Sequence, residues 1–190
     1  MTSTWTENAA AGRLSVVPAT DRLDLLAEPV AEALRALPAD AAARCGVAEI
    51  DPTLADTAEL CARFDVPLSA SANCVVVSGK RAGETRYAAC LVLATTRVDV
   101  NGAVKRWLDV RKASFAPMAD AVGLTGMEYG GITPLGLPAD WPLLVDPAVA
   151  ATPLTVVGSG TRRGKLLVPG EILAALPGAE VLPGLGVPVS

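Results

Sequence analysis

Two apolar runs flanking a short polar stretch constrain the fold of this chain most strongly. The first run is Cys-Val-Val-Val at 74–77, and the second extends from Tyr87 to Ala94. Short runs that are apolar on both faces are typical of buried strands. Residues 78–84 between them contain two glycines and three charged side chains. We therefore expect a β-hairpin with a loop of about seven residues.

The rest of the chain alternates between helical and strand-like patterns. Val30, Leu34 and Leu37 recur at helical spacing after Pro29, and Pro38 ends that pattern. A second helix is expected over 55–64, with Asp56 or Thr53 as its cap. Further strands are expected at 110–115, 143–146, 154–158 and 165–168, and further helices at 101–108 (capped by Asn101), from Pro117, and at 169–176. The pattern predicts a single α/β domain at 25–177, a loose N-terminal arm at 1–24 and an irregular tail at 178–190.

Composition excludes several classes of function. The 190 residues are 51% hydrophobic and include no histidine. A chain without histidine has no Ser-His-Asp or Cys-His mechanism and no histidine-ligated zinc. Hydrolysis would depend on another device, such as substrate assistance, an oriented water, a lysine or a carboxylate.

The four cysteines do not form a recognisable metal or disulfide pattern. Cys45, Cys61, Cys74 and Cys90 are separated by 16, 13 and 16 residues, with no CxxC pair. Cys74 and Cys90 lie in apolar runs and are expected to be small core residues. A nucleophilic role for one of them remains open. We expect no metal and no cofactor.

Charge is distributed unevenly on an acidic protein. The net charge is -4 overall, whereas residues 80–112 carry eight basic and three acidic side chains. This basic stretch is either a solvated surface or a local patch that contacts phosphate. An acidic total argues against nonspecific binding along a duplex, but it permits a few contacts to one nucleic-acid end.

Residues 126–138 are the strongest local signal for a site. They hold four glycines and two prolines, so they cannot form the interior of a regular element. Such a segment is either a long turn between strands or a loop that presents backbone amides to a carbonyl oxygen. Neither a Walker phosphate loop nor a GxGxxG motif is present.

Two weaker signals follow. Gly158-Ser159-Gly160-Thr161-Arg162-Arg163-Gly164 comes directly after an apolar strand, and is either a hairpin turn or a second wall of a pocket. Asp146 ends an apolar run before Pro147. It is either a cap or turn former, or a general base.

These segments, in this order, resemble a known family. The apolar run at 73–77, its hairpin partner at 87–94 and Val-Arg-Lys-Ala-Ser-Phe-Ala at 110–116 come first. Leu-Thr-Gly-Met-Glu-Tyr-Gly-Gly-Ile-Thr-Pro-Leu-Gly-Leu at 124–137, Leu-Val-Asp at 144–146 and Val-Gly-Ser-Gly at 157–160 follow. Together they resemble the YbaK/prolyl-tRNA synthetase-associated domain family, the trans-editing aminoacyl-tRNA deacylases, over residues 25–177.

The resemblance implies an α/β fold in which helices wrap a mixed, curled β-sheet, or partial barrel. It implies a hydrolase that acts on the carboxylic ester joining a wrong amino acid to tRNA, with the tRNA acceptor end as partner, together with an aminoacyl-tRNA synthetase. Its motifs place catalytic residues at Asn73, Gly131 and Asp146. They place substrate-binding residues at Lys112, Gly130, Thr133, Pro134, Gly136, Gly158, Ser159 and Gly160.

One position departs from the family. The family usually has a lysine at the start of the first core strand, where this chain has Asn73. Asparagine forms hydrogen bonds but offers no charge to a phosphate. Lys112 could supply a cation from another strand. The departure leaves three readings: an altered substrate, a weak activity, or a binding module that kept the fold and lost catalysis. A different class of function is a hydrolase that acts on small esters without tRNA. It would use the same glycine loop.

The chain also lacks an apolar stretch of the roughly 18 residues that a spanning helix needs. Its first 20 residues do not show the pattern of a secretory signal. We therefore expect no membrane association and a cytoplasmic location.

Overall fold

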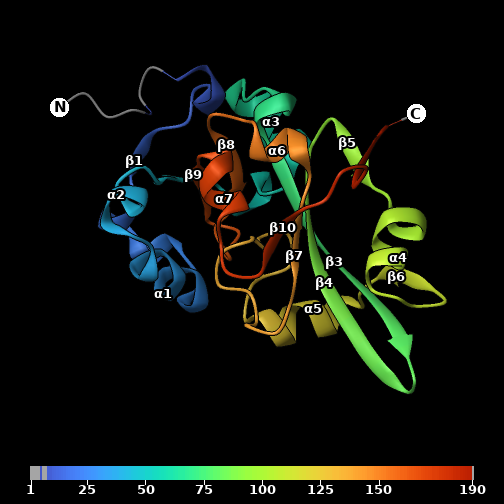
Figure 1. Ribbon diagram of the computed structural model, residues 1–190. Coiled ribbons are helices and arrows are strands. Elements are labelled where there is room, and N and C mark those ends of the chain that lie inside the picture. Colours follow the sequence, from blue (N-terminus) through green and yellow to red (C-terminus); the bar gives the residue numbers. More distant parts are fainter. Residues whose placement is uncertain (1–4, 6–7, 190) are drawn as a thin grey trace.

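The expected hairpin is the longest strand pair of the computed structural model, which describes Trp5 and residues 8–189. Strand β3 (Ala72–Arg81) pairs antiparallel with β4 (Glu84–Leu93) along ten residues (Figure 1). The loop has two residues, Ala82 and Gly83, both with positive φ. The prediction of a seven-residue loop was wrong, because the polar side chains belong to strand ends that extend beyond the core into solvent.

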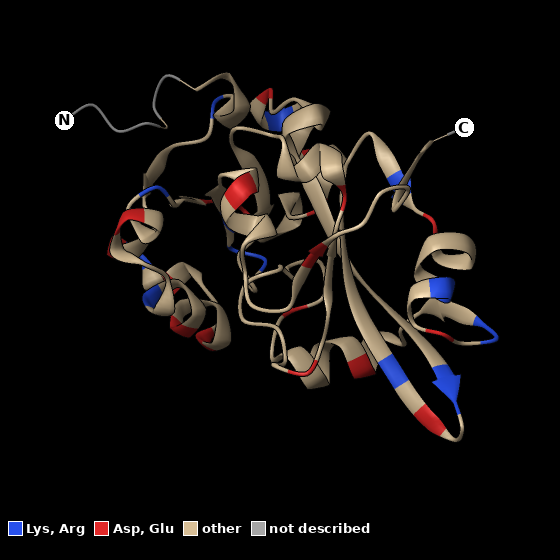
Figure 2. Cartoon of the chain, in the orientation of Figure 1, with Lys and Arg blue, Asp and Glu red and all other residues tan. Residues whose placement is uncertain are grey.

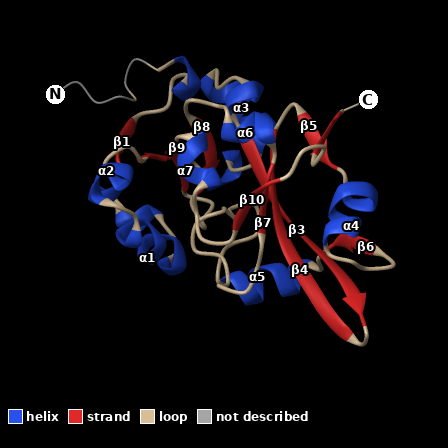
Figure 3. Cartoon of the chain, in the orientation of Figure 1, coloured by secondary structure: helices blue, strands red, loops and turns tan. Residues whose placement is uncertain are grey.

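The hairpin forms the centre of a five-stranded mixed sheet with the order β10-β7-β4-β3-β6. Strand β6 (Ala113–Phe115) runs antiparallel to β3. Strand β7 (Leu143–Val145) runs parallel to β4, and β10 (Ala179–Val181) runs parallel to β7. A mixed sheet of this kind, with helices around it, confirms the predicted α/β fold class (Figure 3).

A second sheet packs beside the first. It has the antiparallel order β1-β2-β9-β8, formed by Val16–Pro18, Gly46–Glu49, Gly164–Val168 and Thr155–Gly158. A bridge between Ser71 and Val156 joins its β8 edge to the start of β3. A third sheet pairs β5 (Thr96–Val98) with β11 (Gly186–Pro188).

Short helices cover these sheets. The α-helices are α1 (Glu28–Ala36), α2 (Ala39–Ala42), α3 (Thr57–Phe64), α4 (Lys105–Trp107), α5 (Met118–Thr125), α6 (Pro147–Ala150) and α7 (Gly170–Ala174). A π-helical turn at Val100–Val104 leads into α4, and 3-10 turns lie at Ala9–Ala11, Ala19–Asp21, Leu23–Leu25, Pro52–Leu54 and Leu68–Ala70. The main core includes the fully buried Leu34, Leu91, Leu143 and Leu166, so it joins α1 to both sheets.

Helix starts follow local chemistry, with two differences from expectation. Asp99, not Asn101, caps the turn before α4, since its carboxylate accepts the Gly102 and Ala103 amides. Asp56 stands at the N-cap position of α3 but makes no capping bond.

Both ends of the chain are more ordered than their composition suggested. Within the described part of the expected arm, β1 pairs with β2, and Leu14, Val16 and Ala19 are buried. In the expected tail, β10 and β11 each pair with a strand. These segments are stabilised by tertiary strand pairing, so their own sequence carries little periodic signal.

Candidate functional site

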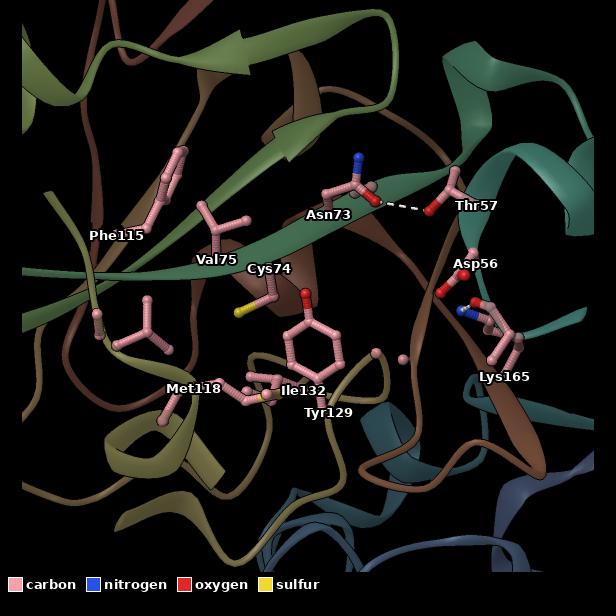
Figure 4. A pocket seen from close by; sticks show the side chains of 17 residues that line it. Asp56, Thr57, Asn73, Cys74, Val75, Phe115, Met118, Tyr129, Ile132 and Lys165 are labelled. Carbon is pink, nitrogen blue, oxygen red and sulfur yellow. Dashed lines mark hydrogen bonds between the residues drawn. The ribbon is translucent and has the colours of Figure 1, made fainter. Parts of the chain in front are cut away.

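A cavity of about 550 Å³ lies between the start of β3 and the glycine- and proline-rich segment 126–138, called the Gly-Pro loop below. Helix α5, the end of β6 and Lys165 of β9 complete its walls. Figure 4 shows that its two ends differ in chemistry. Asp56, Thr57, Asn73 and Lys165 lie at one end, and Val75, Phe115 and Met118 lie at the other. A ligand that fits this cavity therefore has one polar and one apolar part.

Asn73 is held in place by a side chain from α3. Thr57 Oγ1 donates to Asn73 Oδ1 at 2.6 Å. This bond uses the amide oxygen of Asn73. Its Nδ2 donor forms no hydrogen bond with the described protein, which leaves it available to a ligand.

Lys165 reaches the polar end from β9, directly after segment 158–164. Only 7% of its surface is exposed, and its Nζ donates to Ala55 O at 2.7 Å. Burial lowers the pKa of Lys165 to about 8, although the Asp56 carboxylate nearby acts in the opposite direction. The site therefore holds a cation that water solvates poorly.

Asp56, at the polar end, is paired with Arg162, which lies outside the cavity lining. Arg162 Nη1 lies 3.5 Å from Asp56 Oδ1 and also donates to Tyr129 O at 3.3 Å. Its Nε donates to Pro52 O at 3.2 Å. Arg162 thus ties the Gly-Pro loop to the segment before α3, on one side of the cavity.

The Gly-Pro loop and segment 158–164 pack backbone against backbone. The Gly160 amide donates to Gly131 O at 2.8 Å, and the Glu128 amide donates to Gly160 O at 2.8 Å. A Cβ on Gly131 would lie 2.7 Å from Thr161 O, and one on Gly158 would lie 2.4 Å from Gly131 O. Glycine is required at both positions because no side chain fits between the two segments.

This packing leaves part of the loop facing the cavity with unused donors. Gly130 and Ile132 line the cavity, and neither amide reaches an acceptor among the described residues. Preorganised backbone donors beside a cavity can polarise the carbonyl oxygen of a bound ligand.

The apolar end is partly open. Phe115 and Tyr129 are each 62% exposed and Met118 is 57% exposed, although all three line the cavity. Cys74 also lines it, and burial raises the pKa of its thiol to about 12. A thiol with this pKa stays protonated at neutral pH, which argues against a cysteine nucleophile.

Of the residues expected in the site, Asn73, Gly130 and Gly158 line the cavity and Gly131 adjoins them. The second half of the Gly-Pro loop turns inward instead. A Cβ on Gly136 would lie 2.3 Å from Pro29 O at the start of α1, and Thr133 and Pro134 are buried. The Thr133 hydroxyl has no hydrogen-bond partner in the described structure.

Ser159 and Gly160 do not line the cavity, contrary to expectation. Ser159 Oγ bonds to Leu25 O and Gly164 O, each at 3.0 Å, and a Cβ on Gly160 would meet Ala27. Both residues fix the turn before β9, and so they position Lys165 indirectly.

Asp146 also lies away from the cavity lining. Its Oδ1 accepts the Ala148 amide and its Oδ2 accepts the Gly186 amide, each at 2.8 Å. With both oxygens engaged, Asp146 caps α6 and attaches β11. This matches the alternative of a cap rather than that of a general base.

Lys112 is exposed and lies outside the cavity, just before β6. It is near the projecting end of the hairpin, since Ala113 pairs with Gly79. Figure 2 shows basic residues on that end of the hairpin and on the neighbouring segment. The basic stretch of the sequence is thus a surface feature.

Sequence reasoning missed Lys165, Asp56 and Thr57 as site residues. For Lys165 a signal was present: a lysine begins the apolar run 165–168, and lysine is almost never fully buried without a reason. Asp56 and Thr57 carried no such signal, because both are ordinary residues for a helix start.

Among the described residues, no group of three or more acidic, cysteine or histidine side chains could hold a metal ion, and the four cysteines are unpaired. In the same part of the chain, no helix has the length and apolarity required to cross a membrane.

Comparison with known proteins finds relatives by family and by fold. No curated protein matches the chain. A solved structure described as a candidate trans-editing enzyme for prolyl tRNA synthetase superposes with a TM-score of 0.66 at 21% identity, over 87% of this chain and 97% of that one. The hypothetical protein APE2540 superposes with a TM-score of 0.64 at 24% identity, over 74% and 90% of the two chains. A scaffold from a computational epitope-grafting design gives 0.67 at 23% identity, over 82% and 96%.

At these identities the structures support the fold alone. The family follows from the sequence profile of the aminoacyl-tRNA editing domain, which matches residues 51–176. Every residue that lines the cavity falls within this span. The chain belongs to the aminoacyl-tRNA editing domain family.

Proposed function

We propose that this protein is a trans-editing aminoacyl-tRNA deacylase that hydrolyses the ester of mischarged tRNA in the cavity beside the Gly-Pro loop. The observation that carries the proposal is the arrangement of this cavity. Two unused backbone amides, those of Gly130 and Ile132, belong to residues that line it, and its two ends differ in polarity.

The apolar end suits the side chain of the misattached amino acid. Val75, Met118 and Ile132 offer apolar contacts without a charged partner. The terminal ribose would then lie toward Asn73, whose free Nδ2 can donate to a hydroxyl. Selection by a pocket of this kind depends on size, and one methylene is worth about 1–3 kcal/mol.

The chemistry needs few protein groups. The loop amides donate to the ester carbonyl oxygen, which becomes negative as a water oxygen adds to the carbonyl carbon. The bond from that carbon to the ribose oxygen then breaks, and the ribose oxygen takes up a proton released by the water. The products are the free amino acid and tRNA with its terminal hydroxyl restored. A water or a substrate group, rather than a histidine, accepts the proton in transit.

A panel of mischarged tRNAs tests the proposal. We expect release of the amino acid from at least one tRNA that carries an apolar residue. We expect Ala116→Trp, which fills the apolar end, to abolish the release, and Ala36→Trp, on the exposed end of α1, to retain it. Binding to the panel without turnover would instead favour the binding module suggested by Asn73. Turnover of small esters but of no tRNA would favour the small-ester hydrolase.

We expect the protein to act in the cytoplasm, where charged tRNA is made, and to work beside an aminoacyl-tRNA synthetase.

A further inference from the structure

Lys165 is the most unusual side chain of the cavity. It is the second residue of β9, and the three residues after it, Leu166, Leu167 and Val168, are fully buried. Its own exposed fraction is 7%, yet it reaches the cavity. A lysine in this environment loses most of its hydration.

Lys165 forms no ion pair with the described protein. No carboxylate oxygen lies within 4.0 Å of Lys165 Nζ among the described residues. The Asp56 carboxylate acts on this charge from farther away and pairs with Arg162 instead. The Ala55 carbonyl accepts one of the three ammonium hydrogens. Two donors therefore remain for a ligand.

An apolar residue at this position would give the folded protein equal or greater stability. Replacing buried charges by apolar side chains of similar size is often neutral or stabilising. The lysine is thus poorly explained by folding, whereas a cavity that must bind an anionic oxygen explains it directly. Asn73, on strand β3 at the same end of the cavity (Figure 4), brings no charge of its own.

We propose that Lys165 is the cation of this site and binds an anionic oxygen of the acylated tRNA end through its two free N–H donors. The inference rests on the proposed function. Two groups of the substrate can supply this anionic oxygen. One is the phosphodiester next to the terminal nucleotide, and the other is the ester carbonyl oxygen after water has added to the carbonyl carbon. A desolvated ammonium favours either one over a neutral group.

The test compares Lys165→Met with the wild type on two substrates. One is the mischarged tRNA that the wild type hydrolyses best, and the other is the same amino acid esterified to adenosine, which carries no phosphate. Arg35→Met, on the exposed face of α1 and outside both the cavity lining and the basic stretch 80–112, is the control and should behave like the wild type.

The two sources predict different results. If Lys165 binds the oxyanion, kcat falls by about 10²–10³ on both substrates. If it binds the phosphodiester, KM for the tRNA rises by about tenfold or more, the salt slope of tRNA binding falls by about one, and the adenosine ester is hydrolysed normally. Rates within twofold of the wild type on both substrates would overturn the inference.

A separate measurement keeps the inference distinguishable from the proposed function. If the wild type hydrolyses no tRNA of the panel, the deacylase proposal fails, and binding of cytidylyl-adenosine, which carries one phosphodiester, decides the role of Lys165. At least tenfold weaker binding by Lys165→Met supports an anion site, and equal binding by both proteins overturns it.

Discussion

Removing the buried cation should make the protein more stable near neutral pH. Burial lowers the pKa of Lys165 from 10.5 to about 8, so folding disfavours its charged form. At pH 7 the side chain is protonated in both states, and the full penalty applies. The difference of two to three pH units corresponds to about 3 kcal/mol of lost stability.

Lys165→Met replaces the lysine side chain by an apolar side chain of similar length. It removes the penalty of about 3 kcal/mol, but it also leaves the Ala55 carbonyl without its donor, which costs about 1–3 kcal/mol. We therefore expect a net gain of about 1 kcal/mol at pH 7.

The pH dependence gives the sharper expectation. Between pH 8 and pH 10.5 the unfolded wild type holds a proton on Lys165 that the folded protein has released, so wild-type stability rises with pH in this window. The methionine variant lacks this rise. Relative to the wild type, it should lose about 2.5 kcal/mol between pH 7 and pH 10.

Urea unfolding of both proteins at pH 7 and pH 10, with a reductant for the four free cysteines, measures this difference. Groups that titrate in both proteins cancel in the comparison. Lys80→Met, at the exposed end of the hairpin, is the control and should give a constant difference from the wild type. A constant difference for Lys165→Met as well would refute the reasoning, and a large loss of stability at pH 7 would show that the lysine serves the fold.

Other residues give further expectations. Asn73→Ala should lower turnover about tenfold, since it removes one hydrogen bond. Asn73→Lys should tighten tRNA binding and steepen its salt dependence. If neither variant changes tRNA binding in a filter assay or the rate of deacylation, Asn73 is not part of the site. Lys112→Glu should weaken tRNA binding while the adenosine ester is hydrolysed as before, and an equal loss on both substrates would contradict a role outside the cavity. Gly131→Ala should lower the melting temperature together with turnover, because its Cβ would lie 2.7 Å from Thr161 O; an unchanged melting temperature would show that the two loops do not pack as described. Blocking exposed thiols should leave turnover unchanged, whereas inactivation reversed by reduction would point to a cysteine such as Cys74.

Local patterns were sufficient for the two strands of the hairpin, for several helices and for the loop of the site. The apolar runs of the hairpin, the Pro-started helices and the density of glycine and proline at 126–138 each reflect forces that act between near neighbours. The order of these segments was enough to indicate the family, and the profile match over 51–176 agrees.

The assignment of roles within the site could not be made in the same way. Gly131 and Asp146 are both conspicuous in the sequence. In the structure, Gly131 allows segment 158–164 to pack closely against the Gly-Pro loop, and Asp146 joins α6 to β11. Which atoms face a cavity depends on contacts between residues far apart in the chain.

Lys165 shows this division most clearly. The sequence determines that β9 is an apolar strand with a lysine at its start, because strand propensity and hydrophobic pattern are local properties. Only the tertiary structure places that lysine beside Ala55, 110 residues earlier, and turns an ordinary charged side chain into a desolvated cation. Burial and solvation are properties of the packed chain, so the sequence alone could name the loop of this site but not its charge.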